Sequence, residues 1–111
     1  MTTLAYQRLA TAAGLNPNMA AATAGGDTIP FNERGFLMVK NGSAASINLT
    51  LVVPGNTQFG LANPDPVIAI PAGATMLIGP MTQALGDPTN NLICTVQYSA
   101  VASVTVAAVQ M

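Results

Sequence analysis

Residues 46–53 read Ser-Ile-Asn-Leu-Thr-Leu-Val-Val, and this stretch decides the fold. Every second position carries an aliphatic side chain: Ile47, Leu49, Leu51 and Val53. Asn48 and Thr50 lie between them and point to the opposite side of an extended chain. Because side chains alternate between the two faces of a β-strand, this pattern predicts a strand with one face buried and the other exposed.

Apolar runs of similar length lie on both sides of this stretch, and turn-forming residues separate them. Asn41-Gly42 precedes it, Pro54-Gly55 follows it, and Pro71-Ala72-Gly73 divides two further runs. Such residues accept or impose the backbone angles that tight turns need. The other predicted strands are residues 36–40, 67–70, 75–78, 92–99 and 101–109. Six short strands with these connections predict an all-β fold, a small antiparallel β-sandwich or a jelly-roll-like barrel, with the strand order left open.

The chain changes character near residue 34, so residues 1–33 are predicted to be an N-terminal arm and residues 34–111 the β domain. Residues 11–28 consist mostly of Ala, Gly, Thr and Asn without an apolar period, which predicts no core of their own. Residues 4–13 fit either a weak helix that stops at Gly14 or an extended arm that becomes ordered on a neighbouring subunit. The extended arm is favoured because isolated helices of this length are marginal in water.

Charged side chains are scarce. They make up 6% of the residues, against about 25% in a typical soluble domain. A surface so poor in charge indicates burial against other proteins, although the plentiful Thr, Asn, Ser and Gln could instead keep a free monomer soluble. With a net charge of −1 and three basic residues, the chain has no basic patch for nucleic acid or an anionic membrane. No apolar run reaches the roughly 18 residues of a membrane span, and the N-terminus lacks the features of a signal peptide, so we expect synthesis in a cytoplasm.

Residues that could carry chemistry are few. Histidine, the commonest general base and metal ligand, is absent. Cys94 lies among the apolar residues of a predicted strand, where a thiol is usually inert packing. Asp65 and Asp87 each precede a proline, as turn residues commonly do, and the dispersed glycines form no phosphate-binding loop. We therefore expect no catalytic residues, no cofactor and no metal, and we predict that the chain is not an enzyme.

Several short stretches of the chain resemble small structural proteins of tailed phages that accompany the major capsid protein. They are residues 27–32 (DTIPFN), 36–43 (FLMVKNGS), 49–55 (LTLVVPG), 70–73 (IPAG), 78–80 (IGP), 98–101 (YSAV) and 104–109 (VTVAAV). Such proteins are β-rich and serve as head decoration or minor capsid subunits. The resemblance implies a viral structural protein on the capsid exterior of a bacteriophage virion, made in the host cytoplasm, with the major capsid protein as its partner.

Self-association is a second expectation, because oligomers around a symmetry axis, for example trimers, would hide sheet edges and apolar loops. The candidate interface residues are apolar side chains of the arm and of the loop after the first proline-glycine pair: Leu4, Tyr6, Leu9, Leu15, Phe31, Phe59 and Leu61. The alternative function is a tail- or portal-associated β module that recognises a host carbohydrate or protein through the loops at residues 55–66 and 86–91.

Overall fold

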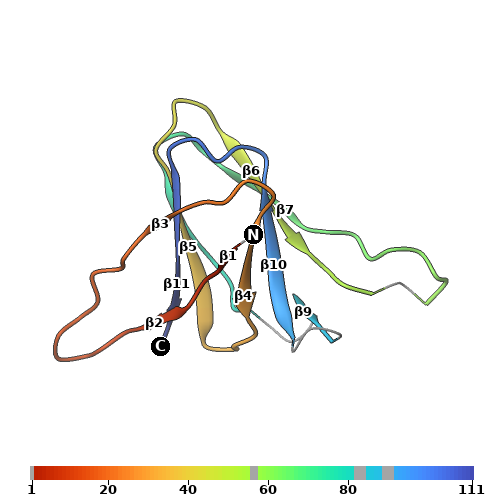
Figure 1. Cartoon of the computed structure of the whole chain (residues 1–111), viewed down its shortest axis with the longest axis horizontal. Helices are drawn as coiled ribbons and strands as arrows, with labels where there is room; N and C mark the ends of the chain where they lie inside the picture. The colour runs from red at the N-terminus through yellow and green to blue at the C-terminus, as the bar shows by residue number, and fades with distance from the viewer. Residues whose placement is uncertain (1, 56–57, 82–84, 89–91) are drawn as a thin grey trace.

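The computed structural model describes residues 2–55, 58–81, 85–88 and 92–111, and within them it is all-β (Figure 1). The short strands near the N-terminus and before β10 are β1 (Thr2–Thr3), β2 (Tyr6–Arg8), β3 (Ala20–Ala21) and β9 (Gly86–Asp87). The longer strands are β4 (Asp27–Pro30), β5 (Gly35–Asn41), β6 (Ile47–Val52), β7 (Val67–Ile70), β8 (Thr75–Ile78), β10 (Ile93–Tyr98) and β11 (Val104–Gln110). No α-helix occurs in this described part of the chain, so the weak helix considered for residues 4–13 does not form.

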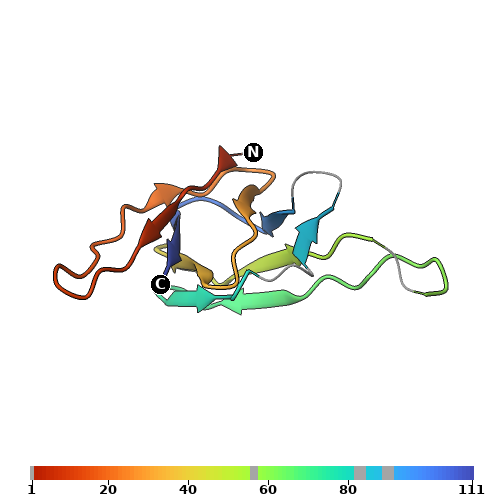
Figure 2. The same ribbon diagram turned by 90° about the horizontal axis from the view of Figure 1, so that it is seen from below.

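The strands form two sheets that pack face to face (Figure 2). One sheet has the order β1-β4-β10-β6-β7, with β9 also on β10, and the other has the order β2-β11-β5-β8, with β3 also on β11. From β4 onward the chain crosses from one sheet to the other at nearly every connection, and only β6–β7 and β9–β10 stay within one sheet. The two facing, mostly antiparallel sheets make a small β-sandwich, which confirms the predicted fold class.

All six strands predicted from the sequence are present, and five agree with the prediction to within two residues at each end. The sixth, predicted for residues 101–109, begins later, at Val104. The reason is a turn in which the Val104 amide donates to the Val101 carbonyl at 3.2 Å and Ser103 adopts a φ of 60°. A residue with positive φ cannot continue a strand, so β11 starts after it.

The core is a single apolar layer between the two sheets. Alternate residues of the central strands supply it and are fully buried: Leu37 and Val39 from β5, Leu49 from β6, Val96 from β10, and Val106 from β11. Burying one such side chain stabilises the fold by about 1.5–3 kcal/mol relative to leaving it exposed. The alternate apolar side chains that predicted β6 from the sequence are therefore the ones that pack the two sheets together.

The N-terminal segment is built into this sandwich. β1 pairs with β4 in one sheet and β2 pairs with β11 in the other, so residues 2–8 close one side of the gap between the sheets. Leu4, between the two strands, is buried in the core. Tyr6 donates a hydrogen bond from its hydroxyl to the Pro30 carbonyl at 2.6 Å, and its ring lies so close to Gly35 that a Cβ there would overlap it.

Residues 9–19 form an exposed arc between β2 and β3 (Figure 1). Its base is closed by Gln7, whose side chain donates to the Asn18 carbonyl at 3.0 Å and accepts from the Asn18 amide at 2.7 Å. β1 to β4 belong to the chain's own sheets. Of the predicted N-terminal arm, this arc is therefore the part that could reach a neighbouring subunit.

Asn41, at the end of β5, is a fully buried polar residue that joins two turns. Its side-chain nitrogen donates to the carbonyls of Ala45, Ile70 and Pro71 at 2.9, 3.0 and 3.3 Å. Its side-chain oxygen accepts from the amide and the hydroxyl of Ser43 at 3.1 and 2.6 Å. The β5–β6 turn and the β7–β8 turn are thus held by one side chain.

We predict that Asn41→Ala lowers the free energy of unfolding by about 2–4 kcal/mol, because it removes a buried donor and leaves polar groups around it without their partner. The control is Asn48→Ala on β6, where the residue is exposed and a change below about 0.5 kcal/mol is expected. Urea unfolding followed by circular dichroism measures both. Equal stability of the two variants would contradict the role given to Asn41.

Candidate interaction surface

Groups that could perform chemistry do not gather in the described residues. No cluster of three or more Cys, Asp or Glu side chains with metal-binding geometry is found there. Cys94 is buried within β10, and burial raises the pKa of its thiol. A membrane-crossing helix, long and apolar enough for the purpose, is likewise not found in this part of the chain.

Asp27 is a buried carboxylate that fastens β4 to β10. The Tyr98 hydroxyl donates to its Oδ2 at 2.8 Å, and the Thr23 amide donates to the same oxygen at 3.3 Å. Burial, and then the hydrogen bond to Asp27, raise the pKa of Tyr98. A carboxylate held in this way has a structural role, since its oxygen is occupied by groups of the fold itself.

Exposed apolar side chains are a more distinctive feature of the surface. Among the described residues, the large hydrophobic side chains that remain exposed are Leu9, Phe59, Leu61, Val67, Leu77 and Met111. Val67 and Leu77 lie on β7 and β8, which are the outermost strands of the two sheets on the same side of the sandwich. Neither strand contains a charged residue or a proline, the usual devices that keep sheet edges from pairing. We call this surface the β7–β8 edge.

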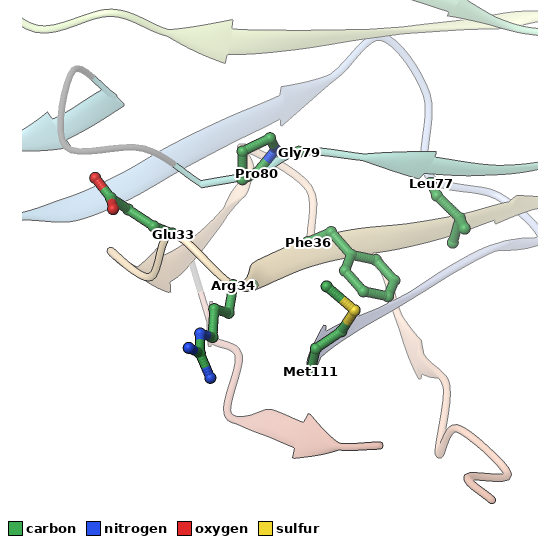
Figure 3. Close-up of a pocket in the computed structure, with 8 residues that line it drawn as sticks. Glu33, Arg34, Phe36, Leu77, Gly79, Pro80 and Met111 are labelled. Carbon is green, nitrogen blue, oxygen red and sulfur yellow. The ribbon is translucent and has the colours of Figure 1, made fainter. Parts of the chain in front are cut away.

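A pocket of about 380 Å³ opens next to this edge, and we call it the β8 pocket. Figure 3 shows Phe36, Leu77 and Met111 gathered on one side of it, with Glu33 and Arg34 on the other. Gly79 and Pro80, which follow β8, complete its wall. A smaller pocket of about 290 Å³ lies between β7 and β8 and shares Leu77, Gly79 and Pro80 with the first. The two pockets make this border of the molecule both apolar and concave.

The loop between β6 and β7 extends away from the body of the molecule in both views (Figures 1 and 2). Its base is braced by Asp65, which accepts a hydrogen bond from the Val53 amide at 2.8 Å. Asn63 adds a bond from its side-chain nitrogen to the Pro54 carbonyl at 3.1 Å. The brace holds Phe59, with 89% of its surface exposed, and Leu61, with 69%, away from the core. We call Phe59 and Leu61 the loop tip.

The structure places the interface residues predicted from the sequence in three different settings. Leu4 is buried, and Tyr6 and Phe31 are half-buried against the core, so these three side chains contribute to the chain's own fold. Leu15 is half-buried and Leu9 exposed, both on the arc at residues 9–19. Phe59 and Leu61 are exposed, as an interface residue must be.

Sequence reasoning missed Val67, Leu77 and Met111. The signal for the first two was present, because residues 67–70 and 75–78 are apolar at nearly every position instead of at every second one. In a strand at the edge of a sandwich, such a pattern places apolar side chains outward as well as inward. The loop at residues 86–91, named for the alternative function, falls partly outside the described residues, at 89–91.

Comparison of the chain with protein-family models, curated proteins and solved structures gave no match. Function is therefore inferred from the surface of the chain itself. That surface combines an uncharged sheet edge, an apolar pocket beside it and an apolar loop tip.

We predict that neither tyrosine ionises at its usual pKa of 10.0 while the protein is folded. Burial, with a smaller effect from nearby Cys94, raises the pKa of Tyr6 to about 12, and the pKa of Tyr98 is also raised. Because folding favours the neutral form of both phenols, their burial stabilises the folded chain fully below pH 10. This contribution is lost as the pH rises through the folded-state pKa values.

Ultraviolet absorbance of tyrosinate gives the measurement, and it is unambiguous because the chain has two Tyr and no Trp. The urea-unfolded chain, as control, should titrate near pH 10, and the folded chain only at higher pH together with unfolding. Half-ionised tyrosine at pH 10 in a chain that keeps its far-ultraviolet circular dichroism would contradict the burial of these rings.

We predict that Cys94 reacts with a disulfide reagent only after unfolding, since the thiolate is the reactive form and burial disfavours it. The chain has one Cys, so the release of a coloured thiol reports this residue alone. The rate in buffer should be far below the rate in urea. Equal rates would show an accessible thiol and reopen the question of a nucleophilic role.

Proposed function

We propose that the chain is a structural protein that decorates or cements a viral capsid shell, as an accessory head subunit of a tailed phage. Its partners in this proposal are the major capsid protein and other copies of itself, and its place is the capsid exterior. The role is one of protein–protein contact and not of catalysis. The single observation that carries the proposal is the uncharged β7–β8 edge with Val67 and Leu77 exposed on it.

The β7–β8 edge supports this role because an uncovered sheet edge gives a free monomer no benefit and exposes it to pairing with other chains. An unprotected edge offers unpaired backbone groups to any extended chain and is normally shortened, charged or covered. On the opposite side of the sandwich, β1, β2 and β3 are only two or three residues long, and β2 ends at Arg8. Short strands and a charged residue protect that side, whereas the β7–β8 edge has no charged residue. This difference favours an edge that is covered in the working assembly.

The fold and the composition support the proposal more generally. Two-sheet β-sandwiches, jelly rolls among them, occur in viral capsid domains as well as in lectins and many cell-surface domains, so this support is a fold-level analogy. The low content of charged residues, 6%, fits a protein whose surface is largely in contact with neighbours. The resemblance of the short stretches to phage head proteins points the same way.

The alternative is a tail- or portal-associated module that binds a host carbohydrate or protein. The described end of the β6–β7 loop presents Phe59 and Leu61 in place of the convergent polar groups that orient a sugar. This apolar tip favours a protein partner over a carbohydrate. Copy number separates the two functions, because a shell protein is present in hundreds of copies and a tail or portal module in few.

The test mixes the purified chain with phage heads that lack it and images them by electron microscopy. The expected result is added density on the outer surface in a regular array. Val67→Lys should reduce occupancy about tenfold or more, because it places a charge in a contact that excludes water.

The matched control is Ala102→Lys, which adds the same charge at an exposed turn between β10 and β11. It should decorate as the unmodified chain does. Heads that gain no density from the folded, unmodified protein would refute the proposal.

A further inference from the structure

The pair Asn41-Gly42 combines a reactive sequence with a protected position. It is the one Asn-Gly pair in the chain, and its asparagine is the last residue of β5. In an unfolded chain, asparagine loses ammonia most readily when Gly follows it, because Gly has no Cβ to hinder the ring closure. Gly42 is exposed, whereas the Asn41 side chain is fully buried. The geometry around the pair therefore decides whether the reaction occurs.

We propose that Asn41-Gly42 is a latent deamidation site. The fold keeps it unreactive, unfolding of the end of β5 makes it reactive, and the product prevents the chain from folding again. The inference is independent of the capsid role, because it concerns the covalent chemistry of the chain itself.

The reaction needs only water and hydroxide. The Gly42 backbone nitrogen gives up its proton to hydroxide and attacks Asn41 Cγ. The new N–Cγ bond replaces the Cγ–Nδ2 bond, and the side-chain nitrogen takes a proton from water and leaves as ammonia, which restores the hydroxide. Water then breaks one C–N bond of the cyclic imide and leaves aspartate or isoaspartate at position 41.

The attacking nitrogen is engaged in the fold. The Gly42 amide donates a hydrogen bond to the Ser103 carbonyl at 2.9 Å. Loss of the amide proton would break this bond, which connects the end of β5 to the turn before β11. The nucleophile is therefore unavailable while the bond is in place.

The backbone of Asn41 is held in a conformation that does not allow the attack. Asn41 pairs with Val104 of β11, its amide donates to the Ala74 carbonyl at 2.9 Å, and its carbonyl accepts from the Gly73 amide at 2.8 Å. Ring closure requires the Gly42 nitrogen to turn toward Asn41 Cβ, and the extended backbone of a strand keeps it turned away. Rotation into the reactive conformation would disrupt these contacts on both sides of β5.

The side chain that would be attacked is fixed as well. Asn41 Nδ2 donates to the carbonyls of Ala45, Ile70 and Pro71, which hold the leaving group in the interior. Asn41 Oδ1 accepts from the amide and the hydroxyl of Ser43. Donors on that oxygen polarise the carbonyl and by themselves would favour attack. The protection therefore comes from the positions of the two reacting groups.

Either product is incompatible with this environment. Aspartate has no N–H to offer to the carbonyls of Ala45, Ile70 and Pro71, and it would bring a negative charge against their oxygens in a buried site. Isoaspartate adds a methylene group to the main chain before Gly42, which displaces the Gly42 amide from the Ser103 carbonyl. A chain modified at Asn41 is therefore excluded from the folded state.

The first test compares deamidation of the full chain in buffer and in urea at the same pH and temperature, followed by peptide mass spectrometry. Conversion of Asn41 should be at least about a hundredfold slower in the folded chain, because the end of β5 must open first and an opening cost of about 2.7 kcal/mol gives that factor. Asn48 is the internal reference, since it is exposed on β6 and Leu follows it. It should react slowly in both conditions. Equal rates at Asn41 in buffer and in urea would overturn the proposal.

The second test asks whether the product blocks refolding. The chain is kept in urea until part of Asn41 has converted, the urea is removed, and size-exclusion chromatography separates folded from unfolded and aggregated protein. The folded fraction should contain unmodified Asn41, and the modified chains should be confined to the other fraction. Modified chains at equal frequency in both fractions would contradict the proposed effect of the product.

Two matched variants reproduce the added charge without the reaction. Asn41→Asp creates one of the two products, and Asn48→Asp adds the same charge at an exposed position. Asn41→Asp should lose the cooperative thermal transition seen by circular dichroism, whereas Asn48→Asp should keep it. An Asn41→Asp chain as stable as Asn48→Asp would overturn the claim that the product is excluded. None of these results depends on whether the chain decorates phage heads, so the two proposals fail separately.

Discussion

The shared apolar layer between two facing sheets is the constraint on which the rest of this structure depends. In a chain of 111 residues, one such layer supplies nearly all of the stabilising burial. The central strands of one sheet therefore alternate, with Leu49 of β6 and Val96 of β10 turned inward and Asn48 and Gln97 turned outward. The two polar residues that are fully buried in the described part of the chain, Asp27 and Asn41, are bonded to groups of the fold itself. They join elements that the apolar layer alone would leave loose.

The same layer has two open sides, and the chain treats them differently. The N-terminal segment closes one side, with β1 in one sheet, β2 in the other and the Tyr6 hydroxyl bonded to Pro30 across the gap. The other side is bounded by β7 and β8, which are uncharged and carry Val67 and Leu77 outward. This difference between the two sides is the physical basis for proposing that the chain acts in an assembly. A partner that covers the side bounded by β7 and β8 would close the gap between the sheets there, as residues 2–8 close it on the opposite side.

The sequence was sufficient for the central strands and insufficient for the segments whose partners are distant. The alternation in residues 46–53 and the turn residues around it predict β6 and its neighbours because both signals are local. β1 to β3 are two or three residues long and exist only because β4 and β11 pair with them, so no local pattern marks them. For the same reason no local pattern indicates that Leu4, Tyr6 and Phe31 pack against the chain's own core. The exposure of Phe59 and Leu61 agrees with their place in a loop bounded by prolines, where no strand turns their side chains toward the core.

Hydrogen exchange tests the central claim, that the β7–β8 edge is the surface the assembly covers, more directly than other measurements. Exchange would be compared between the dilute chain and the chain on its particle. The account predicts that backbone amides of residues 67–70 and 75–78 slow down on assembly, while those of the central strand β6 change little. Unchanged exchange along β7 and β8, with new protection confined to other faces of the molecule, would contradict it.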